Sequence, residues 1–142
     1  MMNNNQLNDN EKKYFQLILS FFDDYRHEIE RQINAAKIER EVYTEHLFLY
    51  FSYDNFSVKS ELPIVASICV KCKDGDVVDL ILHRNLAGQV KELEVFSYLF
   101  YELDCSKICE GAIINKYLRY ENGTERLWEL NENTDHLELK KI

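Results

Sequence analysis

Four cysteines offer this chain its clearest opportunity for metal chemistry. They form two pairs, Cys69 with Cys72 and Cys105 with Cys109, and four thiolates at such spacings can bind zinc. Cys69, however, lies in an apolar run typical of a strand, where residues three apart point to opposite faces. A buried free cysteine behaves as a small hydrophobic residue. The sequence therefore favours four reduced structural thiols and predicts no metal and no cofactor.

Acid–base chemistry would centre on His83. This residue follows the apolar run 80–82 and lies across a predicted hairpin from Glu92 or Glu94. A His–Glu pair can transfer protons. The sequence has no nucleophile-elbow, zinc-protease or phosphate-loop motif to accompany it, which favours an ordinary histidine at a strand end. The alternative is a small enzyme or ligand-binding domain with a pocket between helix and sheet near His83.

Recognition chemistry is the third possibility, and alternate residues of the segment 92–98 carry it. They are acidic or aromatic, and in a strand they project from one side. Carboxylates attract the Lys and Arg residues of a partner, and aromatic rings anchor interfaces. A solvated sheet face fits the pattern equally well. The candidate partner-binding residues are Glu92, Glu94, Phe96 and Tyr98, with a rival acidic surface in the tail at Glu121, Glu125 and Glu129.

The element that must present this segment is a hairpin over 77–98. Apolar and polar residues alternate on its second arm, with Leu93 and Val95 on the side opposite the glutamates. Residues 84–89 form the turn, and Gly88 is the residue expected at positive φ. The hairpin thus has one apolar face and one acidic, aromatic face.

A long amphipathic helix is predicted before the strands. Apolar residues recur at helical spacing up to about Ala36, and Asn8 or Asn10 can cap the first turn. A second helix starting at Asp23-Asp24 after a kink is the alternative. Residues 1–8 are polar and are expected to fray.

Five strands follow the helix, over 38–43, 47–53, 64–73 and the two arms of the hairpin. The run 47–53 is apolar on both faces, which predicts a central strand covered on both sides. Successive strands with short turns predict an antiparallel meander with the helix packed on one face, an α+β fold. Residues 101–142 form a C-terminal extension. In it, 101–108 is irregular or helical, 113–120 is helix or strand, and 126–130 and 136–142 are short strands.

Composition limits the function. The chain has 142 residues, 46% of them hydrophobic, and a formal net charge of −8. These values predict a single globular domain over 1–142. We expect no nucleic-acid partner, because an acidic chain lacks the excess of Lys and Arg that phosphates require. We expect no membrane partner, because no apolar run is long enough to span a bilayer. The first ten residues lack the pattern of a secretory signal, so we expect a cytoplasmic protein. The oligomeric state stays open.

The order of these features resembles that of small bacterial immunity proteins, including those of contact-dependent growth inhibition and related polymorphic toxin systems. The resemblance covers roughly residues 25–100. It depends on the end of the helix, the hairpin after it, the Leu62-Pro63 step and a final strand that runs from a glycine into a Leu-Glu-aliphatic-aromatic pattern. These segments are Glu30-Arg-Gln-Ile-Asn-Ala-Ala-Lys37, Ile38-Glu-Arg-Glu-Val-Tyr-Thr-Glu-His-Leu-Phe-Leu-Tyr-Phe51 and Gly88-Gln-Val-Lys-Glu-Leu-Glu-Val-Phe-Ser-Tyr98.

The resemblance implies a protein that is not an enzyme. Such proteins bind a cognate toxin domain in the producing cell and neutralise it. The acidity of this chain adds, on electrostatic grounds, that the toxin is basic, for example a nuclease.

Overall fold

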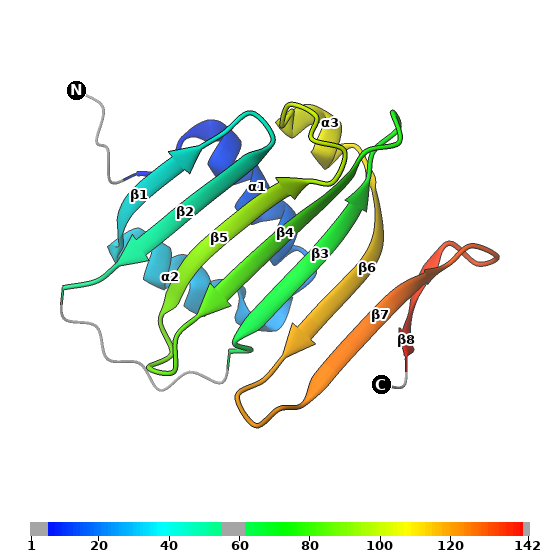
Figure 1. Ribbon diagram of the computed structural model, residues 1–142. Coiled ribbons are helices and arrows are strands. Elements are labelled where there is room, and N and C mark those ends of the chain that lie inside the picture. Colours follow the sequence, from blue (N-terminus) through cyan, green and yellow to red (C-terminus); the bar gives the residue numbers. More distant parts are fainter. Residues whose placement is uncertain (1–5, 55–61, 141–142) are drawn as a thin grey trace.

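The computed structural model describes residues 6–54 and 62–140. The helical elements are α1 (Asp9–Leu19), the short 3₁₀ helix η1 (Asp23–Tyr25), α2 (Arg26–Ala35) and α3 (Cys105–Cys109). The strands are β1 (Lys37–Val42), β2 (His46–Ser52), β3 (Val65–Lys71), β4 (Val77–Arg84), β5 (Val90–Ser97), β6 (Ala112–Arg119), β7 (Glu125–Asn131) and β8 (His136–Lys140). They form one antiparallel sheet in the order β1-β2-β5-β4-β3-β6-β7-β8 (Figure 1).

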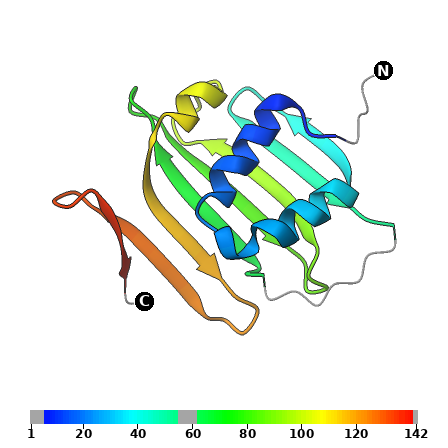
Figure 2. The same cartoon turned by 180° about the vertical axis from the view of Figure 1, so that it is seen from behind.

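The helices lie on one side of this sheet only. Figure 2 shows α1 and α2 across one face, here called the covered face, while β7 and β8 extend beyond the helices. The opposite face, turned toward the viewer in Figure 1, carries no helix and is here called the open face. The predicted α+β class, with helices on one face of an antiparallel sheet, is therefore confirmed.

The predicted single long helix is wrong, because the chain turns between α1 and α2. A capping box at Asn8 and Glu11 starts α1, which ends at Leu19. Phe22 then leaves the helical conformation, with φ −135°, and its side chain is buried. The alternative of a second helix near Asp23-Asp24 comes closer, since η1 begins at Asp23 and leads directly into α2.

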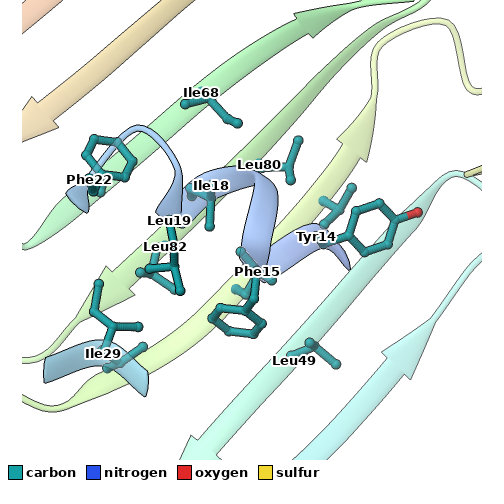
Figure 3. Packing of buried hydrophobic residues seen from close by; sticks show 14 of the residues in the cluster. Tyr14, Phe15, Ile18, Leu19, Phe22, Ile29, Leu49, Ile68, Leu80 and Leu82 are labelled. Atoms are coloured by element: carbon teal, nitrogen blue, oxygen red, sulfur yellow. The ribbon is translucent and has the colours of Figure 1, made fainter. Parts of the chain in front are cut away.

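The core lies between the two helices and the covered face. Figure 3 shows Ile18 of α1 near Leu80 and Ile29 of α2 near Leu82, with Leu49 further along the same face; all belong to one core cluster. The burial of the strand residues follows from alternation, since every second residue of a strand points to the same face. Ile18, Leu49 and Leu80 have no exposed surface.

We expect Ile29→Ala to lower the free energy of unfolding by about 2–5 kcal/mol, because it leaves a cavity beneath α2. Ile29 is only 3% exposed and belongs to the core cluster. Urea unfolding measures the effect, with the exposed Asn34→Ala of the same helix as control. An unchanged midpoint for Ile29→Ala would show that this side of α2 is not packed.

The predicted meander order is also wrong, because β2 pairs with β5 and not with β3. Leu49 lies opposite Leu93 in this pair. The connection from β2 to β3 spans residues 53–64, a length sufficient to cross β5 and β4, since β2 and β3 lie three strand spacings or about 14 Å apart. The loop predicted at 54–63 lies here, and its residues 55–61 are outside the described residues.

The tail is part of the sheet and not an extension of it. β6 pairs along β3, and β7 and β8 continue the sheet from there. The predicted strands at 126–130 and 136–142 are confirmed as β7 and β8 as far as Lys140, and the ambiguous segment 113–120 is strand β6. Within 101–108, residues from Cys105 onward begin α3.

Two polar clamps tie the helices to the sheet. The Gln32 amide is fully buried, donates to the Gly88 carbonyl at 2.9 Å and accepts from the Val90 amide at 2.7 Å. Gly88 has φ +84°, as predicted for the hairpin turn. The second clamp joins Glu11 of α1 to Arg40 of β1.

The first described residues are held in place by the same region. The carbonyl of Gln6 accepts from the Arg40 guanidinium, and Leu7 packs against the core. These two contacts connect residues 6 and 7 to the rest of the fold; the expected fraying of residues 1–8 stays a prediction, and residues 1–5 are outside the described residues. No helix in the described parts of the chain is long and apolar enough to cross a membrane.

Candidate partner-binding face

The centre of the open face is a patch of rings and carboxylates contributed by β2 and β5. Pairing places His46 opposite Phe96, Phe48 opposite Glu94 and Tyr50 opposite Glu92. Residues directly opposite on neighbouring strands share a face, so all six side chains project from the open face. We call His46, Phe48, Tyr50, Glu92, Glu94 and Phe96 the aromatic–acidic patch.

β2 does not have the environment that its apolar sequence predicted. Its alternate residues Leu47, Leu49 and Phe51 are buried on the covered face. Phe48 and Tyr50 are only half-buried on the open face. The prediction of a strand covered on both sides is therefore wrong, and its aromatic residues form a surface.

Each of these two rings lies between two acidic residues. On the β1 side, Glu41 is opposite Phe48 and Glu39 is opposite Tyr50. On the β5 side, the same rings face the two glutamates of the patch. The Phe48 and Tyr50 rings are parallel to within 2°, with centroids 6.0 Å apart. A cationic side chain placed against this group would meet aromatic rings and carboxylates together, which favours Lys or Arg.

His46 links the rings to the acidic residues. Its Nε2 lies 2.6 Å from Glu94 Oε2, within hydrogen-bond distance. Its ring centroid is 4.0 Å from that of Phe48 and 4.7 Å from that of Phe96. The hydrogen bond fixes the direction of the Glu94 carboxylate, so this acidic group is pre-oriented on the open face.

Glu92 lies in a less favourable environment. Burial raises the pKa of its carboxyl above the ordinary value, and the negative charge of Glu94 acts in the same direction. His83, directly opposite on β4, lowers that pKa and partly compensates. The predicted proximity of His83 to Glu92 is thus confirmed. A half-buried carboxylate that costs stability when ionised is typical of groups retained for binding.

We expect Glu92→Gln to increase the free energy of unfolding at pH 7. The folded state binds the Glu92 proton more tightly than the unfolded state, so stability falls as the pH rises from the ordinary Glu pKa through the raised folded pKa. Gln, which is neutral at every pH, avoids this loss. Urea unfolding at pH 7 and pH 4 measures it: the advantage over the parent should shrink at pH 4. A lower stability of Glu92→Gln at pH 7 would contradict this, and exposed Glu132→Gln is the control.

The pocket expected between helix and sheet near His83 is nearly filled. The crevice there, lined by Phe22, Ile29, Leu62, His83 and other residues, has a volume of only about 10 Å³. That is room for one water molecule at most. The structure therefore provides no support for a ligand site at this position.

The remaining candidate residues lie along the same open face or at its end. Tyr98 follows β5, is half exposed, and its hydroxyl donates to the Asp79 carboxylate. By strand pairing, Glu125 and Glu129 of β7 project from the open face, four strands from β5, or about 19 Å. Glu121 lies in the β6–β7 turn, 3.5 Å from Arg84. The sequence presented the β5 surface at Glu92 and Glu94 and the tail surface at Glu125 and Glu129 as alternatives, but both lie on the same face of one sheet.

Acidic residues outnumber basic residues on the open face. Strand pairing and alternation assign carboxylates to it from five strands and fewer basic residues. The acidic positions are Glu39, Glu41, Asp79, Glu92, Glu94, Glu125, Glu129 and Glu138, and the basic positions are Lys37, Lys71, Arg119 and Lys140. The imbalance favours a basic partner over an acidic one.

The cysteines divide between the sheet and α3. Cys69 and Cys72 are buried, and burial raises the pKa of the Cys69 thiol to about 12, so it stays protonated. The Cys105 and Cys109 sulfurs lie 3.8 Å apart without a disulfide. No three His, Cys, Asp or Glu side chains among the described residues are arranged to hold a metal ion together. The absence of a metal remains a prediction.

Sequence reasoning did not identify His46, Phe48, Tyr50 or the two β1 glutamates as part of this surface. A signal was present, since β1 and β2 each alternate in polarity or size. The pairing of β2 with β5, which unites these residues with Glu92 and Glu94, joins segments more than 40 residues apart and leaves no local pattern. Comparisons with protein-family models, curated proteins and solved structures found no match for this chain.

Proposed function

We propose that this chain is an immunity protein that binds a cognate toxin domain through the open face and neutralises it inside the producing cell. The observation that carries the proposal is the aromatic–acidic patch: two parallel rings between carboxylates, on the face of the sheet without helices. The resemblance of residues 25–100 to immunity proteins points to the same class. The protein acts by binding and not by catalysis.

The partner expected on this face is a basic protein surface. Rings supply contact area, carboxylates pair with Lys and Arg, and a face of one sign speeds association with the opposite sign. A nuclease domain, whose substrate site is rich in Lys and Arg, has this chemistry. Occupying that site would block the toxin directly.

The small-enzyme alternative loses its main support. It needs a pocket near His83, and the crevice at that position has a volume of about 10 Å³. His83 instead faces Glu92 across β4 and β5 on the open face. No observation favours catalysis over binding.

The proposal predicts that a toxin domain is encoded next to the gene of this chain, and co-production of the two chains tests it. We expect the two purified chains to form a stable complex and the cells to survive production of the toxin. A toxin domain from an unrelated system, matched in size and charge, is the control and should bind at least about 100-fold more weakly. Failure to bind the neighbouring toxin, with cells left unprotected, would refute the function.

A further inference from the structure

The loop that follows β5 exposes four large side chains in succession. The exposed fractions are 50% for Tyr98, 48% for Leu99, 71% for Phe100 and 43% for Tyr101. Isolated exposed apolar residues are ordinary, but a contiguous group marks an interaction surface. This loop lies between β5 and α3 in Figure 1, at one end of the open face.

Phe100 has a backbone conformation that its side chain disfavours. Its φ is +59°, in the left-handed region where a bulky residue is a genuine outlier. Such strain persists only where the surroundings enforce it, and it is concentrated at functional sites. Here the strained residue is also the most exposed ring of the loop, so burial of its side chain does not explain the conformation.

A buried polar network enforces the loop. The Asp76 carboxylate, 1% exposed, accepts from the Ser97 hydroxyl at 2.7 Å and from the Leu99 amide at 3.2 Å. The Ser97 hydroxyl oxygen in turn accepts from the Tyr101 amide at 3.0 Å. These bonds hold the backbone on both sides of Phe100, so its ring is presented in one place at little entropic cost on binding.

The β1–β2 turn braces the same region. The Glu45 carbonyl accepts from the Ser97 amide at 3.0 Å, and the Thr44 carbonyl accepts from the Leu103 amide at 2.8 Å. Tyr43, 53% exposed, precedes these two residues and adds to the apolar area.

The loop is continuous with the aromatic–acidic patch. The Phe100 ring meets the Phe96 ring edge to face, with centroids 6.0 Å apart. Exposed tyrosines of this region contact carboxylates, since Asp79 accepts from the Tyr98 hydroxyl and Glu41 accepts from the Tyr43 hydroxyl. An apolar projection among acidic groups complements an apolar pocket with a basic rim.

We propose that Phe100 is the anchor of the complex, inserting into an apolar pocket with a basic rim on the toxin domain. This inference rests on the proposed function and names the contact that holds the complex together. The acidic residues of the patch set the rate of encounter, whereas Phe100 sets the rate of dissociation. The partner is the toxin domain and not a second copy of this chain, because two acidic faces repel each other.

Phe100→Gly separates binding from folding. Glycine adopts positive φ without strain, so this variant should unfold at the same temperature as the parent or a higher one. Loss of an anchoring ring should nevertheless raise the dissociation rate from the neighbouring toxin domain at least about 30-fold, with the association rate nearly unchanged. Phe100→Trp should keep the dissociation rate within about threefold of the parent. Leu86→Ala, at an equally exposed position in the β4–β5 turn, is the matched control and should change neither rate.

Surface plasmon resonance with the immobilised toxin domain, together with thermal unfolding, distinguishes the outcomes. A Phe100→Gly variant that is folded and dissociates as slowly as the parent would overturn the anchor while leaving the proposed function intact. A parent chain that binds no toxin would overturn both. A parent dimer in analytical ultracentrifugation that Phe100→Gly converts to a monomer would overturn the choice of partner. If Phe100→Gly unfolds more easily, Phe100→Asn, which also tolerates positive φ, repeats the test.

Discussion

Glu92→Lys combined with Glu94→Lys should abolish neutralisation of the toxin. The change reverses two carboxylates beside the Phe48 and Tyr50 rings, where a basic partner would be attracted. We expect the association rate at low salt to fall about 100-fold and to become less sensitive to salt, because electrostatic steering is lost. Stopped-flow or surface plasmon resonance at several salt concentrations measures both effects.

The two glutamates are half-buried, so folding must be tested separately. Lys can extend its charged end to solvent from such positions, but Glu94→Lys also loses the hydrogen bond with His46. Glu92→Gln with Glu94→Gln removes charge at nearly constant shape and should slow association about tenfold. Glu125→Lys with Glu129→Lys is the matched control on the same face, about 19 Å away. A folded double-lysine variant that protects cells as well as the parent would reject the patch; loss of protection in the β7 control alone would move the site to the tail.

Arg40→Met should lower the free energy of unfolding by about 3 kcal/mol, because it leaves the Glu11 carboxylate buried without its cation. Glu11 is 2% exposed, and its two oxygens accept from Arg40 Nε at 2.6 Å and Nη2 at 2.8 Å. The hydrogen bond with Glu11 raises the pKa of Arg40, so the guanidinium stays protonated. Urea unfolding measures the loss.

The double variant Glu11→Gln with Arg40→Met should recover much of that stability, since Gln carries no charge and preserves the capping box with Asn8. This pair lies on the covered face, so both variants should associate with the toxin at the parental rate wherever they are folded. A change below about 0.5 kcal/mol in Arg40→Met would show that water already solvates Glu11.

Local periodicity predicted much of this fold. Ile18, Phe22, Ile29 and Ile33 recur at helical spacing and are buried. The segments at 38–43, 47–53 and 64–73 each contain a strand, and 77–98 is the predicted hairpin of two strands. These patterns depend on neighbours within a few residues. Only Asp23-Asp24 marked the break after Leu19, since Phe21 and Phe22 continue the apolar stripe and no Gly or Pro interrupts it.

Strand order could not be predicted in the same way. Pairing of β2 with β5, and of β6 with β3, is decided by which buried faces fit together across long stretches of chain. Prediction of the candidate site is limited in the same way, because the site depends on the pairing of β2 with β5. Glu92, Glu94 and Phe96 were predicted from alternation within β5, whereas His46 and Tyr50 joined them only through pairing. Phe100 was not predicted, because a positive φ at a non-glycine residue leaves no sequence signature.

Hydroxyl-radical footprinting of the complex tests the central claim most directly, because aromatic side chains react readily when exposed. Addition of the toxin domain should slow oxidation of the open-face and loop residues Phe48, Tyr50, Phe96, Tyr98 and Phe100. Phe21 of the α1–α2 connection and Leu86 of the β4–β5 turn should react at unchanged rates. Protection of Phe21 or the helices, with Phe48 and Phe96 still reactive, would contradict the assignment of the open face as the binding surface.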